Sequence, residues 1–253
     1  MMVTVALSYD ELVAAVEREA AAIAAAFGDG PTDAPVLTCP DWEVRALAHH
    51  LGEFTALWTH VVCEATARPK TPYQPTPPED PTALYEWFTD LARALVDTLR
   101  ATSGDQPSWT WVPSQQHVGF IARRCANEFA MHRYDAQSAR AACTPIDTAL
   151  AAECVLEIPT LVEGWSQQGS YRHEGSGRSL HLCPTERDHE IVLVLGEDEL
   201  ALHREHTDRA DLTLQGTMSD LALVAYDRPP LGHVERVGAE EVFGAWYQEF
   251  HFG

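Results

Sequence analysis

Between residues 44 and 58, apolar side chains recur every three or four positions, which is the spacing of one face of an α-helix. The same spacing recurs over residues 8–28, 82–101, 119–142 and 146–167. A helix with one apolar face gains most of its stability when other apolar surfaces cover that face. The first 165 residues therefore predict a bundle of helices. The stripe of the segment 44–58 consists of Val44, Leu47, Leu51, Phe54 and Trp58.

Local signals refine the boundaries of these helices. Ser8 followed by Glu11 is a capping box, which predicts the start of the first helix. Pro159 predicts a kink or a division in the last helix, because proline lacks the backbone N–H that a helix needs. Residues 68–81 hold six prolines and predict an ordered loop or a stiff connection.

Beyond about residue 168 the pattern changes from helical spacing to alternation and short apolar runs. Residues 179–185, 190–200 and 210–217 are typical of strands, and helical spacing returns over 218–228 and 239–250. Strands combined with helices predict a smaller α+β domain. We therefore expect a two-domain α+β protein, with a helical bundle over residues 1–165 and a C-terminal α+β domain over residues 166–253.

The composition narrows the classes of partner and compartment. A formal net charge of −21 argues against binding to nucleic acid or to an anionic membrane surface, because both are polyanions. The N-terminus lacks the pattern of a signal peptide, and no window is long and apolar enough to span a membrane. The six cysteines show no C-x-x-C pair, so reduced thiols and a cytoplasmic location are expected.

The fourth helical segment places a carboxylate, Glu128, one turn before an imidazole, His132, on its inward face. Burying such groups without partners costs about 2–7 kcal/mol or more, so a salt bridge, a proton relay or a metal ion should compensate. His50 flanks the apolar stripe of the second helix, which allows two histidines and one glutamate to meet inside a bundle. Three protein ligands are typical of a catalytic zinc site. A plain ion pair between Glu128 and His132 remains open.

Two stretches carry a family resemblance. "TCPDWEVRALAHHLGEF" (38–54) and "ARRCANEFAMHRYDAQSA" (122–139) resemble the mycothiol-dependent maleylpyruvate isomerase family. The resemblance implies a metal-binding helical bundle of the DinB type, with up-and-down helices, joined to a C-terminal α+β domain. The matching positions are Cys39, Pro40, Trp42, His50, Glu128, His132, Arg133 and Asp135.

The resemblance also implies a function. His50, Glu128 and His132 would hold a divalent metal, with zinc as the implied ion, and mycothiol would be the co-substrate. The expected activity is addition of the thiolate to a small electrophilic or dicarboxylate substrate, as an isomerase or a thiol transferase. Arg228 would be a catalytic residue facing the site, although the family has glycine before this arginine and this chain has Asp227.

Other features allow different interpretations. A non-catalytic metal-containing protein that binds or senses a small molecule is the alternative to an enzyme, and a closed four-ligand site would favour it. Asp135 is placed either to orient His132 or to pair with Arg133. In "HREH" (203–206) the two histidines would face opposite sides of a strand, which argues against a metal site there. Trp109 and Trp111 either line a pocket or anchor a loop.

Overall fold

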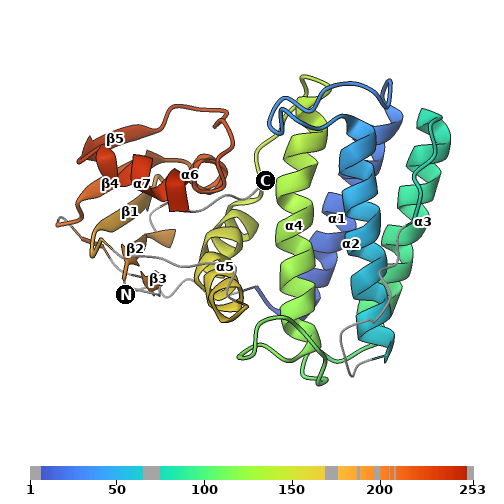
Figure 1. Cartoon of the computed structure of the whole chain (residues 1–253), viewed down its shortest axis with the longest axis horizontal. Coiled ribbons are helices and arrows are strands. Elements are labelled where there is room, and N and C mark those ends of the chain that lie inside the picture. Colours follow the sequence, from blue (N-terminus) through green and yellow to red (C-terminus); the bar gives the residue numbers. More distant parts are fainter. Residues whose placement is uncertain are drawn as a thin grey trace. The chain divides into compact units, whose positions relative to one another are not determined.

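The structure is a computed structural model that describes residues 7–64, 75–168, 176–186, 189–196, 200–204, 206–207 and 209–249. Its contacts divide the chain into a helical unit, Leu7–Thr144, and a second unit that begins at Pro145 (Figure 1). The sequence placed the boundary after residue 165, whereas this division lies before the helix α5, Thr148–Gln167. The reason is that α5 packs against elements of the second unit, as described below.

The helical unit contains α1 (Tyr9–Gly28), α2 (Val44–Glu64), α3 (Pro81–Arg100) and α4 (Val118–Ser138). Helix α1 packs against α3 and α4, and α2 packs against the same two helices, so the four helices enclose one core (Figure 1). The predicted bundle is confirmed. Most of the proline-rich segment 68–81 lies outside the described residues, so the prediction of a loop there remains a prediction.

Contacts at the helix ends establish the directions of the helices. Arg45, in the first turn of α2, forms an ion pair of 2.8 Å with Glu79, which precedes α3. The two helices therefore start at the same end of the bundle and run parallel. Arg140, just after α4, donates a hydrogen bond of 2.8 Å to the carbonyl of Ala26 near the end of α1. Helices α1 and α4 are thus parallel to each other as well.

The predicted start of α1 is confirmed in detail. The backbone N–H of Ser8 donates to the Glu11 carboxylate at 2.8 Å, and the backbone N–H of Glu11 donates to the Ser8 hydroxyl at 3.3 Å. This capping box satisfies two N–H groups that a helix start would otherwise leave without partners. Helix α3 begins in a similar way, with Asp80 as N-cap and Pro81 in the first turn.

Helices α2 and α3 approach closely at Gly52. A Cβ atom at this position would lie 2.3 Å from the indole ring of Trp87, which is closer than any side-chain contact allows. Glycine is therefore required for the observed packing of Trp87 on α2. The close approach fixes the part of α2 that carries His50, two residues earlier in the chain.

The second unit is an α+β structure, as predicted. It contains α5, β1 (Ser179–Pro184), β2 (Ile191–Leu195), β3 (Leu200–His203), β4 (Leu212–Gly216), α6 (Met218–Ala225), β5 (Glu235–Gly238) and α7 (Glu241–Glu249). The sheet order is β3-β2-β1-β4-β5 (Figure 1). Strands β1 and β4 are parallel, and the other neighbouring pairs are antiparallel. Helix α5 packs against α6 and β3.

Three details of this unit differ from the sequence-based expectation. The apolar run 190–200 forms two antiparallel strands, β2 and β3, instead of one. The edge strand β5 was not predicted, because all four of its residues are exposed and no apolar alternation marks it. Helix α5 is not divided and includes Pro159 within its length. In the described part of the chain, no helix is long and apolar enough to cross a membrane.

Candidate metal centre

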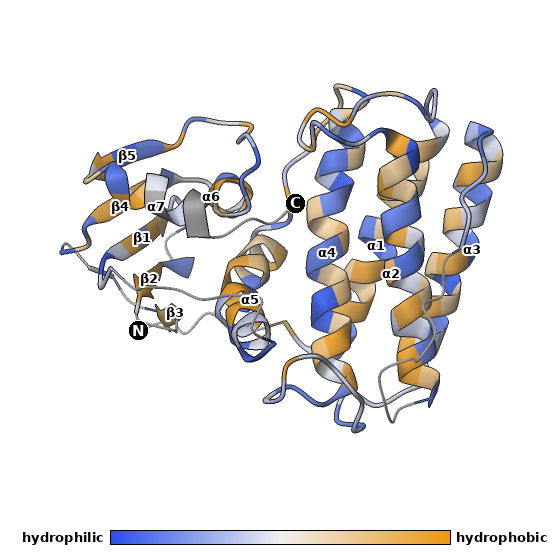
Figure 2. Cartoon of the chain, in the orientation of Figure 1, coloured by the Kyte–Doolittle hydropathy of each residue, from blue (hydrophilic) through white to orange (hydrophobic). Residues whose placement is uncertain are grey.

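Helix α4 carries several hydrophilic residues, seen as blue bands in Figure 2, and many of them are buried. Glu128, His132 and Asp135 are 8%, 7% and 0% exposed. The helical repeat places all three on one side, as the sequence predicted. Such a concentration of buried polar groups is costly unless the groups satisfy each other or bind a ligand.

The structure brings the three predicted ligand residues together across α2 and α4. The Nε2 atom of His50 lies 3.0 Å from Oε1 of Glu128, and Nε2 of His132 lies 3.5 Å from the same oxygen. The centroids of the two imidazole rings are 4.9 Å apart. The side chain of His50 is 38% exposed, whereas those of Glu128 and His132 are about 10% exposed. The centre is therefore accessible on the side of His50.

A hydrogen-bond chain orients His132. Its Nδ1 atom lies 2.8 Å from Oδ2 of Asp135, which is fully buried. The other carboxylate oxygen of Asp135 accepts a bond of 2.6 Å from the hydroxyl of Thr38. Because an ionised carboxylate only accepts hydrogen bonds, Nδ1 donates to Asp135, and Nε2 is the ring nitrogen that faces Glu128. Of the two roles considered for Asp135, this geometry favours the orientation of His132.

The electrostatics keep His50 neutral. Burial is the largest cause that lowers the pKa of His50 to about 3, and the neighbouring His132 and Arg124 act in the same direction. A neutral imidazole is the form that binds a metal. Trp42 covers both rings, with its centroid 5.1 Å from that of His50 and 6.0 Å from that of His132. The tryptophan of the "CPDW" turn thus forms one wall of the centre.

The donor set suits a divalent metal. Tetrahedral zinc with bonds of about 2.0–2.2 Å separates its ligand atoms by about 3.3–3.6 Å, which is close to the separations of 3.0 and 3.5 Å found here. A lone pair of His132 that faces a carboxylate oxygen calls for a cation or a proton between them. Within the described part of the chain, the group of donor atoms at this position consists of His50, Glu128 and His132. Three ligands leave one tetrahedral position for a substrate.

Arg124 is a member of the site that the sequence analysis missed. It forms an ion pair with Oε2 of Glu128, one turn away on α4, and its guanidinium lies 5.8 Å from the centroid of the Phe54 ring. Glu128 therefore presents Oε1 to the two histidines and Oε2 to Arg124. The position of Arg124, four residues before Glu128 on the same helix, was the sequence signal that could have identified this pair.

Two other sequence features have structural roles. Arg133 donates from Nε to Glu19 of α1 at 2.8 Å, and both side chains are buried, so this arginine ties α4 to α1. Trp109 and Trp111 pack on Trp58, with centroid distances of 6.2 and 5.5 Å. The interpretation of Trp109 and Trp111 as anchors of their loop is thus supported.

The predicted catalytic residue Arg228 belongs to the second unit. It is 5% exposed and donates a hydrogen bond of 2.7 Å to the carbonyl of Tyr226. The preceding residue, Asp227, has φ of 59°, in the left-handed region that glycine adopts most easily. Aspartate is among the residues that tolerate this conformation. The role of Arg228 toward the metal centre remains a prediction.

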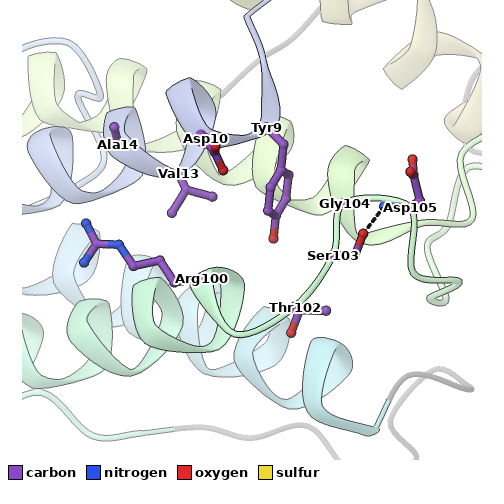
Figure 3. A pocket seen from close by; sticks show the side chains of 9 residues that line it. All are labelled: Tyr9, Asp10, Val13, Ala14, Arg100, Thr102, Ser103, Gly104 and Asp105. Carbon is purple, nitrogen blue, oxygen red and sulfur yellow. Dashed lines mark hydrogen bonds between the residues drawn. The ribbon is translucent and has the colours of Figure 1, made fainter.

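A cavity of about 540 Å³ lies elsewhere in the helical unit, where the start of α1 meets the end of α3 (Figure 3). Its two most prominent polar side chains already have partners. The Tyr9 hydroxyl donates to the carbonyl of Leu99 at 2.7 Å, and Arg100 pairs with Glu17 at 2.6 Å. These two side chains therefore link α1 to α3 beside the cavity. The lining consists of Tyr9, Asp10, Val13, Ala14, Arg100, Thr102, Ser103, Gly104 and Asp105.

Comparisons with known proteins agree with this architecture. Residues 13–137 match the family model described as the mycothiol maleylpyruvate isomerase N-terminal domain. Two crystal structures, of the mycothiol-dependent maleylpyruvate isomerase and of a mutant with one histidine replaced by alanine, are similar at a TM-score of 0.61. Each is 14% identical, and the alignment covers 93% of this chain and 95% of the other. Among curated proteins, none matches significantly. Residues 13–137 therefore form a mycothiol maleylpyruvate isomerase N-terminal domain, and the chain as a whole has the fold of the mycothiol-dependent maleylpyruvate isomerase.

Proposed function

We propose that this protein is a zinc-dependent enzyme that activates mycothiol as a thiolate for addition to a small electrophile. The observation that carries the proposal is the three-residue donor set, His50, Glu128 and His132, inside a domain of the matching family. Its atom separations suit a tetrahedral ion, and its residues leave one position for a thiol. The structurally similar crystal structures are named for the mycothiol-dependent isomerase.

A bound divalent metal would lower the pKa of a coordinated thiol so that it is a thiolate at neutral pH. The chain supplies the means to hold that ion. His50 contributes a neutral imidazole, because burial depresses its pKa to about 3. Asp135 keeps the proton of His132 on Nδ1 and leaves Nε2 for ligation. Trp42 shields both imidazoles from water on one side.

For a maleylpyruvate-type substrate, the proposed reaction is reversible conjugate addition. The thiolate sulfur bonds to one alkene carbon, and the π electrons move onto the conjugated carbonyl oxygen. Rotation about the new single bond follows, and return of the electrons expels the thiolate and leaves the trans alkene. In a transferase the enolate adduct would instead be protonated, and the thiol adduct would be released as the product. Arg228 is the proposed partner of a substrate carboxylate, because a guanidinium binds carboxylates in a bidentate manner.

The first test is metal content with and without His132. We expect about one zinc equivalent at this centre, lost in His132→Ala, because two ligands hold zinc poorly. His60→Ala is the matched control, since His60 lies on the exposed side of α2. Cys183 belongs to a second candidate site, described below, and is therefore also replaced in this comparison. Equal zinc content of the otherwise wild-type protein, His132→Ala and His60→Ala would then contradict the assignment.

The second test addresses the thiol. Mycothiol added to the cobalt-substituted protein should increase the thiolate-to-cobalt absorption above that of the thiol-free protein, and no such increase should occur in His132→Ala. Bound cobalt without this increase would contradict the enzyme proposal and favour a non-catalytic binding protein. We also propose a cytoplasmic location, which the six free cysteines support, because thiols stay reduced in that compartment.

A further inference from the structure

The second unit contains a cluster of metal-ligating side chains that the proposed function does not use. Strand β1 alternates between two kinds of residue: Leu180 and Leu182 are fully buried and apolar, whereas His181 and Cys183 point to the opposite face of the sheet. A histidine and a cysteine two residues apart on a strand are neighbours on one face. Here His181 is 1% exposed and Cys183 is partly exposed.

The pairing of β1 with β2 adds a carboxylate on the same face. Leu182 is opposite Ile191 in the antiparallel register, so Glu190, one residue earlier, comes opposite Cys183. Opposed residues of an antiparallel pair project to the same side. The carboxylate of Glu190 lies 3.1 Å from Nε2 of His181. Donor atoms of His181, Cys183 and Glu190 all lie within 4.8 Å of one another.

A second histidine reaches the same carboxylate. The two histidines of "HREH" do not lie on one strand, contrary to the expectation, because β3 ends at His203. The chain then carries His206 to Glu190, where Nδ1 lies 2.6 Å from Oε2. The rings of His181 and His206 are 5.7 Å apart between centroids. The expectation was therefore wrong for His206.

The geometry points to a second metal site in which His181, Cys183 and Glu190, completed by His206, bind zinc as a closed structural centre. One thiolate, two imidazoles and one carboxylate are the donors that zinc prefers, and four protein ligands are the rule in structural zinc sites. The donor atoms of His181, Cys183 and Glu190 lie within 4.8 Å of one another, near the separations of about 3.3–3.6 Å that tetrahedral zinc requires, and His206 joins them through its contact with Glu190.

Such a centre has a structural consequence. It would tie together β1, the residue that precedes β2 and the segment that follows β3, on the side of the sheet where β3 is the edge strand. Apart from this centre, the three segments are joined by the short hydrogen-bonded ladders between β1 and β2 and between β2 and β3. A closed set of four ligands leaves no position for a thiol, in contrast to the three-ligand centre of the bundle.

Cobalt spectroscopy without any added thiol tests this site. Cys183 is the only cysteine of the two proposed donor sets, so a thiolate-to-cobalt band in the thiol-free protein would come from the second site. We expect the band in the wild type, its loss in Cys183→Ser, and its retention in Cys63→Ser, which changes an exposed cysteine of α2. Retention of the band in Cys183→Ser would overturn the proposal.

Metal content separates this proposal from that for the bundle. The wild type should bind about two zinc equivalents, Cys183→Ser and His132→Ala about one each, and the double variant none. Glu190→Gln serves as a second variant if Cys183→Ser fails to fold, and it should also bind about one. A single equivalent in the wild type that His132→Ala removes would overturn the second site and leave the first intact. A single equivalent in the wild type that only Cys183→Ser removes would overturn the bundle site and leave the second site intact.

Discussion

The proton on His132 decides whether the proposed bundle centre can hold a metal. The Nδ1 atom of His132 can bond to Asp135 only as a donor while that carboxylate is ionised. Thr38 satisfies the second oxygen of the carboxylate from a turn that lies 97 residues earlier in the chain. The ligand histidine therefore depends on two residues that would not touch the metal themselves.

Asp135→Asn should weaken metal binding by about 10–100-fold, because the amide can offer a donor to Nδ1 and so move the ring proton to Nε2. Competition with a chelating dye measures the affinity. Asp90→Asn is the control, since Asp90 is an exposed residue of α3 that pairs with Arg93. Equal zinc affinity of the two variants would contradict the orienting role of Asp135.

At the scale of elements, the ends of the helices hold the bundle together through specific hydrogen bonds. The start of α1 meets the end of α3 where the Tyr9 hydroxyl donates to the carbonyl of Leu99 (Figure 3). That carbonyl is among the last of α3, and it also accepts a hydrogen bond of 3.1 Å from the backbone N–H of Thr102, just after the helix. Burial raises the pKa of Tyr9 to about 12, so the folded protein holds the phenolic proton more tightly than the unfolded chain.

Tyr9→Phe should lower the free energy of unfolding by about 0.5–1.5 kcal/mol through loss of this hydrogen bond. The variant should also respond differently to alkali. Between pH 10 and pH 12 the unfolded wild type releases the proton while the folded form retains it, so the stability of the wild type falls as pH rises. Urea unfolding over this range should show a smaller decline for Tyr9→Phe. Tyr85→Phe, at an exposed position of α3, should decline as the wild type does.

At the scale of the whole molecule, the dominant electrostatic property is the excess of acidic residues. The chain has 38 aspartates and glutamates against 17 lysines and arginines. So large a net charge destabilises the compact state by self-repulsion and keeps the protein away from other polyanions. Ion pairs leave this excess unchanged, because each combines one acidic with one basic residue.

Salt should therefore stabilise the protein at neutral pH. Raising NaCl from about 0.1 M to about 1 M shortens the Debye length from about 10 Å to about 3 Å and screens the repulsion. We expect a higher thermal midpoint at the higher salt concentration. The effect should shrink near the isoelectric point of about 4.8, where the net charge is small. A midpoint that falls with salt at neutral pH would show that attractive pairs dominate instead.

Local patterns accounted for much of what the structure contains. Helical spacing predicted α1 to α4, and the capping box predicted the start of α1 to the residue. These features depend on neighbours within about one turn, so they can be read from the chain alone. The spacing of Glu128 and His132 is of the same kind, and His50 added the second helix to the expected donor set.

Other features depended on contacts between residues far apart in the chain. The parallel arrangement of α2 and α3, the edge strand β5 and the inclusion of α5 in the second unit carry no local signature. The partners of the two clusters, Thr38 for Asp135 and His206 for Glu190, also come from distant segments. Periodicity determines which face of an element is apolar and which residues share that face. Only tertiary packing decides which faces meet, because many pairings bury similar apolar area and specific contacts select among them.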